Sequence, residues 1–276
     1  MVKVLTPQVY PFDYAANKGK QPTSIDYDTL ISEDTDIVVD GVIVCSYRKL
    51  PPEVRATLAA CVKKAKCQKS ARTLGVAQNS AVFGALPRVA VREDYCRFSA
   101  PTKSQPEVFF GLANVAKYLW AVYQDRFPAV AEEFAKFAGK IAPDWKKTGT
   151  PFTTVNVNKN YAIGYHLDAA NYGGVYSNVL ISKKHARGGY FVLPQYRIAL
   201  EQADGALVIV DGVRVPHGVT AIEPTAEIWE RSSVVFYTLG NLQHCLPKKQ
   251  ELARSKKVTT ERARKRARKL DPRQVS

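Results

Sequence analysis

The sequence predicts a mainly β protein, a barrel or jelly roll with α-helices packed on its outside. Three observations predict this class: short β-rich runs recur after Pro143, turn residues separate them, and helical regions precede them. Regular spacing of short strands is typical of barrels and jelly rolls. A chain of 276 residues is long enough for one such domain or for two small ones. The expected strands are residues 152–158, 161–166, 175–181, 190–193, 206–210, 218–222 and 233–238.

Helices are expected at two places before this β-rich part. Pro51 and Pro52 open the first helix, because proline is tolerated in a first helical turn, and apolar residues recur behind them at helical spacing. The second helical region covers residues 107–140. Pro128 divides it, since proline removes a backbone donor from a helix interior.

The remaining segments suggest how the chain is organised. Residues 36–39 and 42–45 have β-like composition, whereas residues 71–101 are rich in Gly, Pro and Arg and are expected to be irregular. We therefore expect three parts: an N-terminal extension with a helix (1–70), a main domain (71–245, with helices in 107–140 and a β core in 151–240) and a basic C-terminal tail (246–276).

The protein is strongly basic. Its formal net charge is +15, and from Lys248 onward twelve Lys and Arg residues stand against three acids. Such a surface attracts polyanions, nucleic acid first and anionic membranes second. The part after about Ser255 is expected to be either disordered or a solvated helix that folds on a polyanion.

The expected location is intracellular, in the cytoplasm, nucleoid or nucleus. No apolar run approaches the roughly 20 residues of a membrane-spanning helix. The N-terminus also lacks the apolar core of a signal peptide.

The cysteines indicate thiols rather than a disulfide framework or a structural zinc site. There are five of them, an odd number, and no Cys-x-x-Cys pair occurs. We therefore expect reduced, buried side chains at Cys45, Cys61, Cys67, Cys96 and Cys245.

Two of the four histidines form a pattern that predicts a metal site. His166 and Asp168 are two residues apart, so on a strand their side chains would project from the same face. His217 follows about fifty residues later, across several expected strands. Two histidines and one carboxylate make the facial triad of non-haem iron sites, which leaves coordination positions open. His-x-Asp alone is a weak signal, and a hydrogen-bonded core histidine is the alternative.

An Arg-x-Ser motif strengthens this interpretation. Arg231 lies 14 residues after His217 and opens another β-rich run that contains Ser233. An arginine buried in a barrel needs an anionic partner. A guanidinium fork with a nearby hydroxyl suits the far end of a dicarboxylate.

The order His-x-Asp, distal His, Arg-x-Ser resembles the double-stranded β-helix 2-oxoglutarate dioxygenases. More narrowly, it resembles the TET/JBP branch, which oxidises the 5-methyl group of cytosine or thymine in nucleic acid. The resemblance covers roughly residues 70–240 and implies a double-stranded β-helix (jelly-roll) core. The stretches that carry it are Phe83-Gly84-Ala85-Leu86-Pro87-Arg88 through Arg92-Glu93-Asp94-Tyr95-Cys96-Arg97, Thr154-Val155-Asn156-Val157-Asn158, and Gly188 to Tyr196.

The resemblance implies a role for each matching position and the cofactors Fe(II), 2-oxoglutarate and O2. It also implies DNA as the partner, with the methylated base flipped or single-stranded. The roles it assigns are iron ligands for His166, Asp168 and His217, 2-oxoglutarate contacts for Arg231, Ser233 and Asn158, and target-base contacts for Asn171 and Tyr237. Turn formation is the alternative role for Asn171, and core packing is the alternative for Tyr237.

Two departures from the family pattern leave the base open. Leu239 stands where TET enzymes place a second base-contacting histidine, and Phe191 stands where animal members have a histidine. An Asn amide can serve cytosine or thymine by flipping, although Asn171 resembles cytosine-directed members. We therefore favour 5-methylcytosine and keep three alternatives: a thymine hydroxylase, an oxygenase acting on a protein or small molecule, and a non-enzymatic nucleic-acid-binding protein. No arginine is assigned to the other 2-oxoglutarate carboxylate, for which Arg72, Arg88 and Arg97 are weak candidates.

Overall fold

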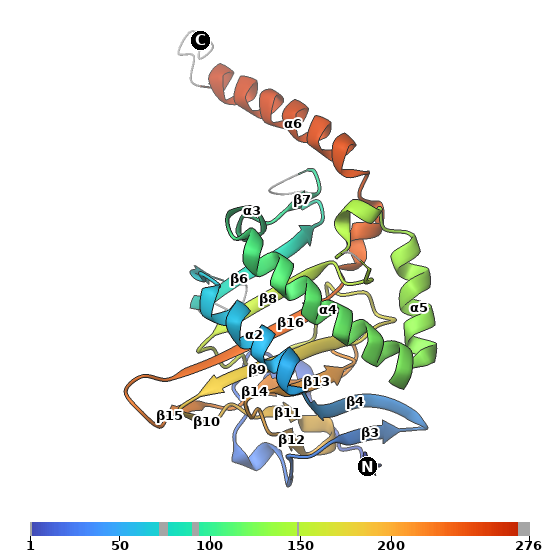
Figure 1. The fold of residues 1–276 in the computed structure, drawn as a ribbon, viewed down its shortest axis with the longest axis vertical. Helices are drawn as coiled ribbons and strands as arrows, with labels where there is room; N and C mark the ends of the chain where they lie inside the picture. The colour runs from blue at the N-terminus through green and yellow to red at the C-terminus, as the bar shows by residue number, and fades with distance from the viewer. Residues whose placement is uncertain (1, 72–76, 90–93, 148, 270–276) are drawn as a thin grey trace.

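The computed structural model describes residues 2–71, 77–89, 94–147 and 149–269. In this part of the chain a ten-stranded sheet forms the larger half of the β core, and nearly all of its strands are antiparallel (Figure 1). In spatial order its strands are β1 (Lys3–Leu5), β3 (Thr35–Val39), β4 (Val42–Lys49), β13 (Ala206–Val210), β9 (Ser177–Lys184), β16 (Glu230–Tyr237), β8 (Thr154–Lys159), β6 (Ala77–Leu86) and β5 (Gln68–Ala71), with β7 (Arg97–Phe98) paired to β6.

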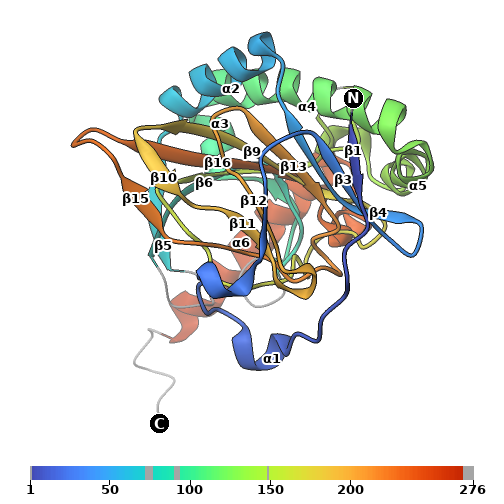
Figure 2. The ribbon, with the colours of Figure 1, turned by 90° about the horizontal axis from the view of Figure 1, so that it is seen from below.

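A smaller sheet faces the first and closes the core. Figure 2 shows the layers in turn: helices, large sheet, small sheet. Between the sheets lies an apolar cluster that includes Ile37, Val208 and Leu193, all fully buried. The small sheet has the order β14 (Gly218–Val219), β11 (Phe191–Leu193), β12 (Ile198–Leu200) and β2 (Thr29–Ile31), and a separate pair joins β10 (Ala186–Gly188) to β15 (Ile222–Pro224).

Helices cover the outer face of the large sheet. The longest of these, α4 (Pro106–Arg126), buries Leu112, Leu119 and Tyr123 against it, as the helical spacing predicts. Pro128 divides the region as expected, because it opens a new helix. The helices are α1 (Tyr14–Asn17), α2 (Pro52–Lys64), α3 (Ala100–Ser104), α4, α5 (Pro128–Gly139) and α6 (Lys248–Lys269), with 3-10 turns η1 (Ser24–Asp26), η2 (Pro143–Trp145), η3 (Pro194–Tyr196) and η4 (Gly240–His244).

The predicted fold class is confirmed, with local corrections. The run 161–166 is a loop with one bridge at His166 and not a strand. The region 71–101 is not irregular throughout, because β6 pairs along six residues with β8 in the large sheet. Strand β6 lacks clear alternation in its sequence, and its partner strand supplies the hydrogen bonds that define it.

The three-part division of the chain remains a prediction. Strands from residues 1–70 pair with later strands in both sheets: β4 with β13, and β2 with β12. The expected basic tail is helix α6 as far as Lys269, and residues 270–276 lie outside the described ranges. No helix in the described ranges is both long and apolar enough to span a membrane.

The expectation of five reduced cysteines is wrong for two of them. Cys96 and Cys245 form a disulfide, whereas Cys45, Cys61 and Cys67 are free. An odd count does not forbid one pair, and a sequence separation of 149 between these two cysteines gives no local spacing that would indicate the pair.

Gly84 in β6 provides a test of the contact between β6 and β8. Its φ is +116°, and an added Cβ would overlap the carbonyl oxygen of Thr153. Gly84→Ala should therefore lower the free energy of unfolding by at least about 2 kcal/mol, measured from urea transitions. Gly139→Ala is the control, since its Cβ meets nothing within 4 Å. Equal stability of the two variants would contradict this close approach.

Candidate metal and cosubstrate site

A cavity of about 450 Å³ lies between the two sheets. Both sheets and the loops at their ends contribute to its walls. All eight residues that the sequence suggested for the site line it, although they come from positions 158 to 237: Asn158, His166, Asp168, Asn171, His217, Arg231, Ser233 and Tyr237. The other two histidines, His185 and His244, are exposed and lie outside it.

Backbone hydrogen bonds bring the two cavity histidines together. The amide of His166 donates to the carbonyl of His217 at 2.9 Å, and the amide of His217 donates back at 3.1 Å. Their ring centroids are 4.2 Å apart. The position of His217 is thus fixed by the segment that carries His166.

Both imidazoles are held with one nitrogen available to a metal. Nδ1 of His166 lies 3.0 Å from the carbonyl oxygen of Gly164, and Nδ1 of His217 lies 2.9 Å from that of Val215. A carbonyl oxygen only accepts, so each Nδ1 carries the hydrogen and each Nε2 keeps its lone pair. Burial, together with the neighbouring His217, lowers the pKa of His166 and so favours the neutral form that binds metals.

Asp168 completes the triad, and its two carboxylate oxygens have different neighbours. Oδ1 lies 3.7 Å from Nε2 of His166, and Oδ2 accepts a hydrogen bond from Ser177 Oγ at 2.5 Å. Gly212 permits this position, because a Cβ there would lie 2.5 Å from Oδ2. The three ligand atoms lie within 4.8 Å of one another. Their chemistry and spacing fit a divalent ion such as Fe(II).

Arg231 is a buried cation at the same cavity. It is 1% exposed, and burial lowers its pKa to about 10. Its two terminal nitrogens donate to the Tyr161 carbonyl at 3.3 Å and to Gln202 Oε1 at 3.4 Å. Arg231 Nε and Gln202 Nε2 have no hydrogen-bond partner among the described residues, and no carboxylate there forms an ion pair with this arginine. An anionic ligand would satisfy both the charge and the donors.

Ser233 and Asn158 form a polar wall on neighbouring strands. Asn158 Nδ2 donates to Ser233 Oγ at 3.4 Å, and Asn156 Nδ2 donates to Asn158 Oδ1 at 3.1 Å. Asn156 Oδ1 is buried without a partner in the described structure. The wall therefore offers a hydroxyl and a free acceptor to a polar ligand.

The positions expected to contact a base line the same cavity. The Asn171 amide nitrogen lies 3.0 Å from Ser177 Oγ, and Asn171 forms a β-bridge with Leu239. Phe191 stacks on His217, with centroids 5.0 Å apart. Of the weak arginine candidates, Arg88 and Arg97 do not line the cavity and Arg72 lies outside the described residues.

A family model matches residues 88–239, more than half of the chain, and its description is the oxygenase domain of the 2OGFeDO superfamily, Tet_JBP. The chain belongs to the Tet_JBP family. This superfamily uses Fe(II), 2-oxoglutarate and O2, which is the cofactor set expected from the sequence.

Individual relatives are more distant. The bifunctional helicase and thymine dioxygenase JBP2 of Trypanosoma brucei brucei is 29% identical over 97 residues, which are 35% of this chain and 9% of that protein. The structure of NgTET1 in complex with 5mC DNA matches with a TM-score of 0.62 and 11% identity, covering 93% of this chain and 90% of that one. A Burkholderia pseudomallei oxidoreductase of the 2OG-Fe(II) oxygenase family has a TM-score of 0.44 and 18% identity, over 69% and 84% of the two chains.

Three residues that support the site were not expected from the sequence: Ser177, Gln202 and Gly212. Each acts through a contact with a residue that carries a motif, and none stands at a diagnostic spacing from it. A serine on a strand or a glycine in a turn is common, so no sequence signal marks these positions.

Ser177→Ala should weaken metal binding, because Asp168 loses the hydrogen bond that orients it. Loss of such a supporting contact typically costs about 10- to 100-fold in metal affinity. Anaerobic titration with Fe(II) or Co(II), followed by absorbance, measures the change. Ser182→Ala, on the same strand but outside the cavity, is the control. Equal affinities for the two variants would show that Ser177 does not support the ligand.

Arg231→Leu should raise the half-saturating 2-oxoglutarate concentration by at least about a hundredfold, since a carboxylate would be left unpaired in a buried site. Succinate release at varied 2-oxoglutarate measures it. Arg231→Lys keeps the charge and loses the fork, so its effect should be intermediate. Unchanged 2-oxoglutarate dependence in the leucine variant would contradict this role.

Proposed function

We propose that this protein is an Fe(II)- and 2-oxoglutarate-dependent dioxygenase that hydroxylates the 5-methyl group of a pyrimidine base in DNA, and that 5-methylcytosine is its preferred substrate. The observation that carries the proposal is one cavity that contains both a His-Asp-His triad and a buried arginine with no carboxylate partner among the described residues. Membership of the Tet_JBP family and the net charge of +15 support DNA as the partner.

Separate groups of residues would bind the metal and the cosubstrate. His166, Asp168 and His217 would hold iron, which supplies the oxidising chemistry once 2-oxoglutarate and O2 are bound. Arg231 and Gln202 would bind the far carboxylate of 2-oxoglutarate, with Ser233 and Asn158 beside it. The apolar face of Phe191 next to His217 restricts water near the triad.

The preference for cytosine rests on the direction of one hydrogen-bond chain. A carboxylate oxygen only accepts, so Ser177 must give its hydrogen to Asp168 Oδ2. Ser177 Oγ is then the acceptor for Asn171, which requires the amide nitrogen to face the serine. Oδ1 of Asn171 remains as an acceptor, and an acceptor complements the 4-amino group of cytosine better than the 4-carbonyl of thymine.

Tyr237 would stack on the extruded base. A methyl group inside a duplex cannot reach a cavity between two sheets, so the base must be flipped or single-stranded. Tyr237 lines the cavity from the same strand face as Arg231 and Ser233. An aromatic ring at this place can contribute about 1–3 kcal/mol of stacking per base.

Thymine is the second candidate substrate. The relative from Trypanosoma is a thymine dioxygenase by name, and its 97 matched residues are 29% identical to this chain. An amide that turned over would present its nitrogen to the thymine carbonyl. The contact between Asn171 and Ser177 opposes that rotation.

Mass spectrometry of nucleosides tests the proposal. Duplexes that contain 5-methylcytosine or thymine are incubated with the protein, Fe(II) and 2-oxoglutarate, and we expect hydroxymethylcytosine in excess of hydroxymethyluracil. Ser177→Ala at saturating metal should lower that ratio, because the Asn171 amide is released. His166→Ala is the inactive control. Absence of both products, with succinate release that DNA does not stimulate, would point to a protein or small-molecule substrate instead.

Variants of Tyr237 separate stacking from packing. Tyr237→Ala should weaken productive DNA binding about tenfold to a hundredfold if the stacking energy is lost. Tyr237→Phe should be nearly neutral because it keeps the ring. Full activity of the alanine variant would remove Tyr237 from base recognition and leave the metal site untouched.

A further inference from the structure

Helix α6 extends away from the β core and its covering helices (Figure 1). Its 22 residues include eleven Lys and Arg and two acids. After Arg254 its described side chains are exposed or half-buried on all sides. A helix that is polar on all sides is not held in place by packing of an apolar face against the core.

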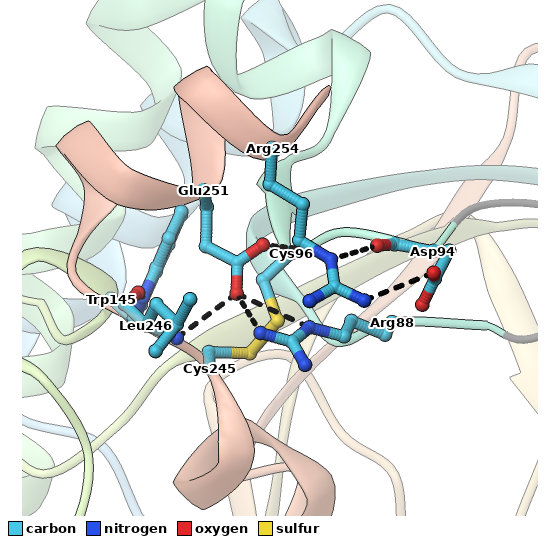
Figure 3. Close-up of polar contacts among 8 residues, drawn as sticks. All are labelled: Arg88, Asp94, Cys96, Trp145, Cys245, Leu246, Glu251 and Arg254. Carbon is cyan, nitrogen blue, oxygen red and sulfur yellow. Dashed lines mark hydrogen bonds and ion pairs between the residues drawn. A yellow bond between two sulfur atoms is a disulfide. The ribbon is translucent and has the colours of Figure 1, made fainter. Parts of the chain in front are cut away.

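The first turns of α6 are nevertheless attached to the domain by hydrogen bonds and ion pairs (Figure 3). Glu251 is 1% exposed, although it is a carboxylate. It accepts hydrogen bonds from Arg88 at 2.6 and 3.2 Å and from the amides of Cys96 and Leu246 at 3.0 Å each. These donors hold the pKa of Glu251 below its usual range.

Further contacts surround this anchor. Arg254 donates to Asp94 at 2.7 Å (carbonyl) and 3.0 Å (side chain). The Cys96–Cys245 disulfide links the segment before α6 to the same loop. Trp145 also donates to the Leu246 carbonyl at 2.8 Å. The start of α6 is thus fixed by charge, hydrogen bonds and a covalent bond.

Beyond the anchor, like charges lie four residues apart. Arg264 is followed by Arg268, a spacing that places both side chains on the same helix face. Such pairs repel and destabilise a helix in water. A polyanion that lies along the helix would neutralise them.

We propose that residues 255–269 of α6 form an arm that binds the phosphates of duplex DNA beside the target base, and that the Glu251 anchor sets its direction. The proposal rests on the proposed function in taking DNA as the partner. DNA is favoured over an anionic membrane because the exposed part of the arm is almost devoid of large apolar side chains, which membrane-surface helices insert into the lipid.

The geometry gives the arm a defined reach. Its 15 residues span about 22 Å at 1.5 Å per residue. That length covers about six base pairs at 3.4 Å each. The arm should therefore add affinity only on duplexes that extend several base pairs beyond the target.

Neutralising the arm tests the phosphate contacts. The variant carries Arg264→Gln, Lys265→Gln, Arg266→Gln and Arg268→Gln, which keep good helix formers on an exposed surface. Fluorescence anisotropy with an unmethylated duplex of about 30 base pairs, at several salt concentrations, gives the slope of log K against log salt. The slope should become shallower by up to about 3.6, at 0.9 per lost phosphate contact. An unchanged slope would overturn the proposal, and so would reduced binding to phosphatidylserine vesicles with unchanged DNA binding.

A matched pair of single substitutions tests the anchor. Glu251→Gln and Glu261→Gln raise the net charge equally, but Glu261 is exposed on the arm itself. A loose polycation would bind DNA as well or better in both variants. A directed arm predicts weaker binding, by several fold, for Glu251→Gln only, and equal affinities of the two variants would overturn that part. Thermal melting checks that each variant is folded.

The two proposals fail separately. Binding of unmethylated duplex involves no turnover, so its result does not depend on which base is oxidised. Conversely, a short methylated oligonucleotide has no flanking duplex for the arm to contact. Its hydroxylation should therefore be the same in the four-glutamine variant and the unaltered protein. Loss of that activity in the variant would overturn the assignment of the arm to flanking duplex.

Discussion

The alternation of side chains along β16 is the constraint on which the rest of the structure depends. Arg231, Ser233, Val235 and Tyr237 face the cavity, whereas Val234 and Phe236 pack under the helices. The strand is hydrogen-bonded to β8 and β9 on its two sides, so its register cannot slip without exchanging the two faces. A slip by one residue would place a guanidinium in the apolar core, at a cost that the fold could not sustain.

One serine links the proposed metal ligand Asp168 to Asn171, the residue proposed to contact the base. Ser177 lies on β9, next to β16, and its hydroxyl contacts both Asp168 and Asn171. Because the carboxylate only accepts, the Ser177 hydroxyl must donate to it and accept from the Asn171 amide nitrogen, so the carboxylate also determines how the amide is turned. Under the proposed function, metal binding and base preference would therefore be coupled through these three side chains.

The sequence was informative where chemistry and local spacing coincide. Arg231 and Ser233 stand on a strand whose alternation is visible. His166 and Asp168 are only two residues apart, so their convergence could also be predicted, although His166 lies on a loop and not on the expected strand. Gln202 and Ser177 reach the site through space, and β6 is a strand because β8 pairs with it. The disulfide and the contact between Arg88 and Glu251 join residues far apart in the chain. Local patterns carry no information about such pairs, so the sequence offers Arg88 as a candidate 2-oxoglutarate ligand although it pairs with Glu251.

The Cys96–Cys245 bond also changes the topology of the chain. Every residue that lines the cavity lies between these two cysteines, so the oxidised polypeptide carries its whole site within one covalent ring. When the fold opens, that ring stays closed and the disordered chain explores fewer conformations. In a chain-entropy treatment a ring of this size contributes about 5 kcal/mol to stability. Reduction of this disulfide would thus lower the stability of the folded protein without altering any residue that lines the cavity.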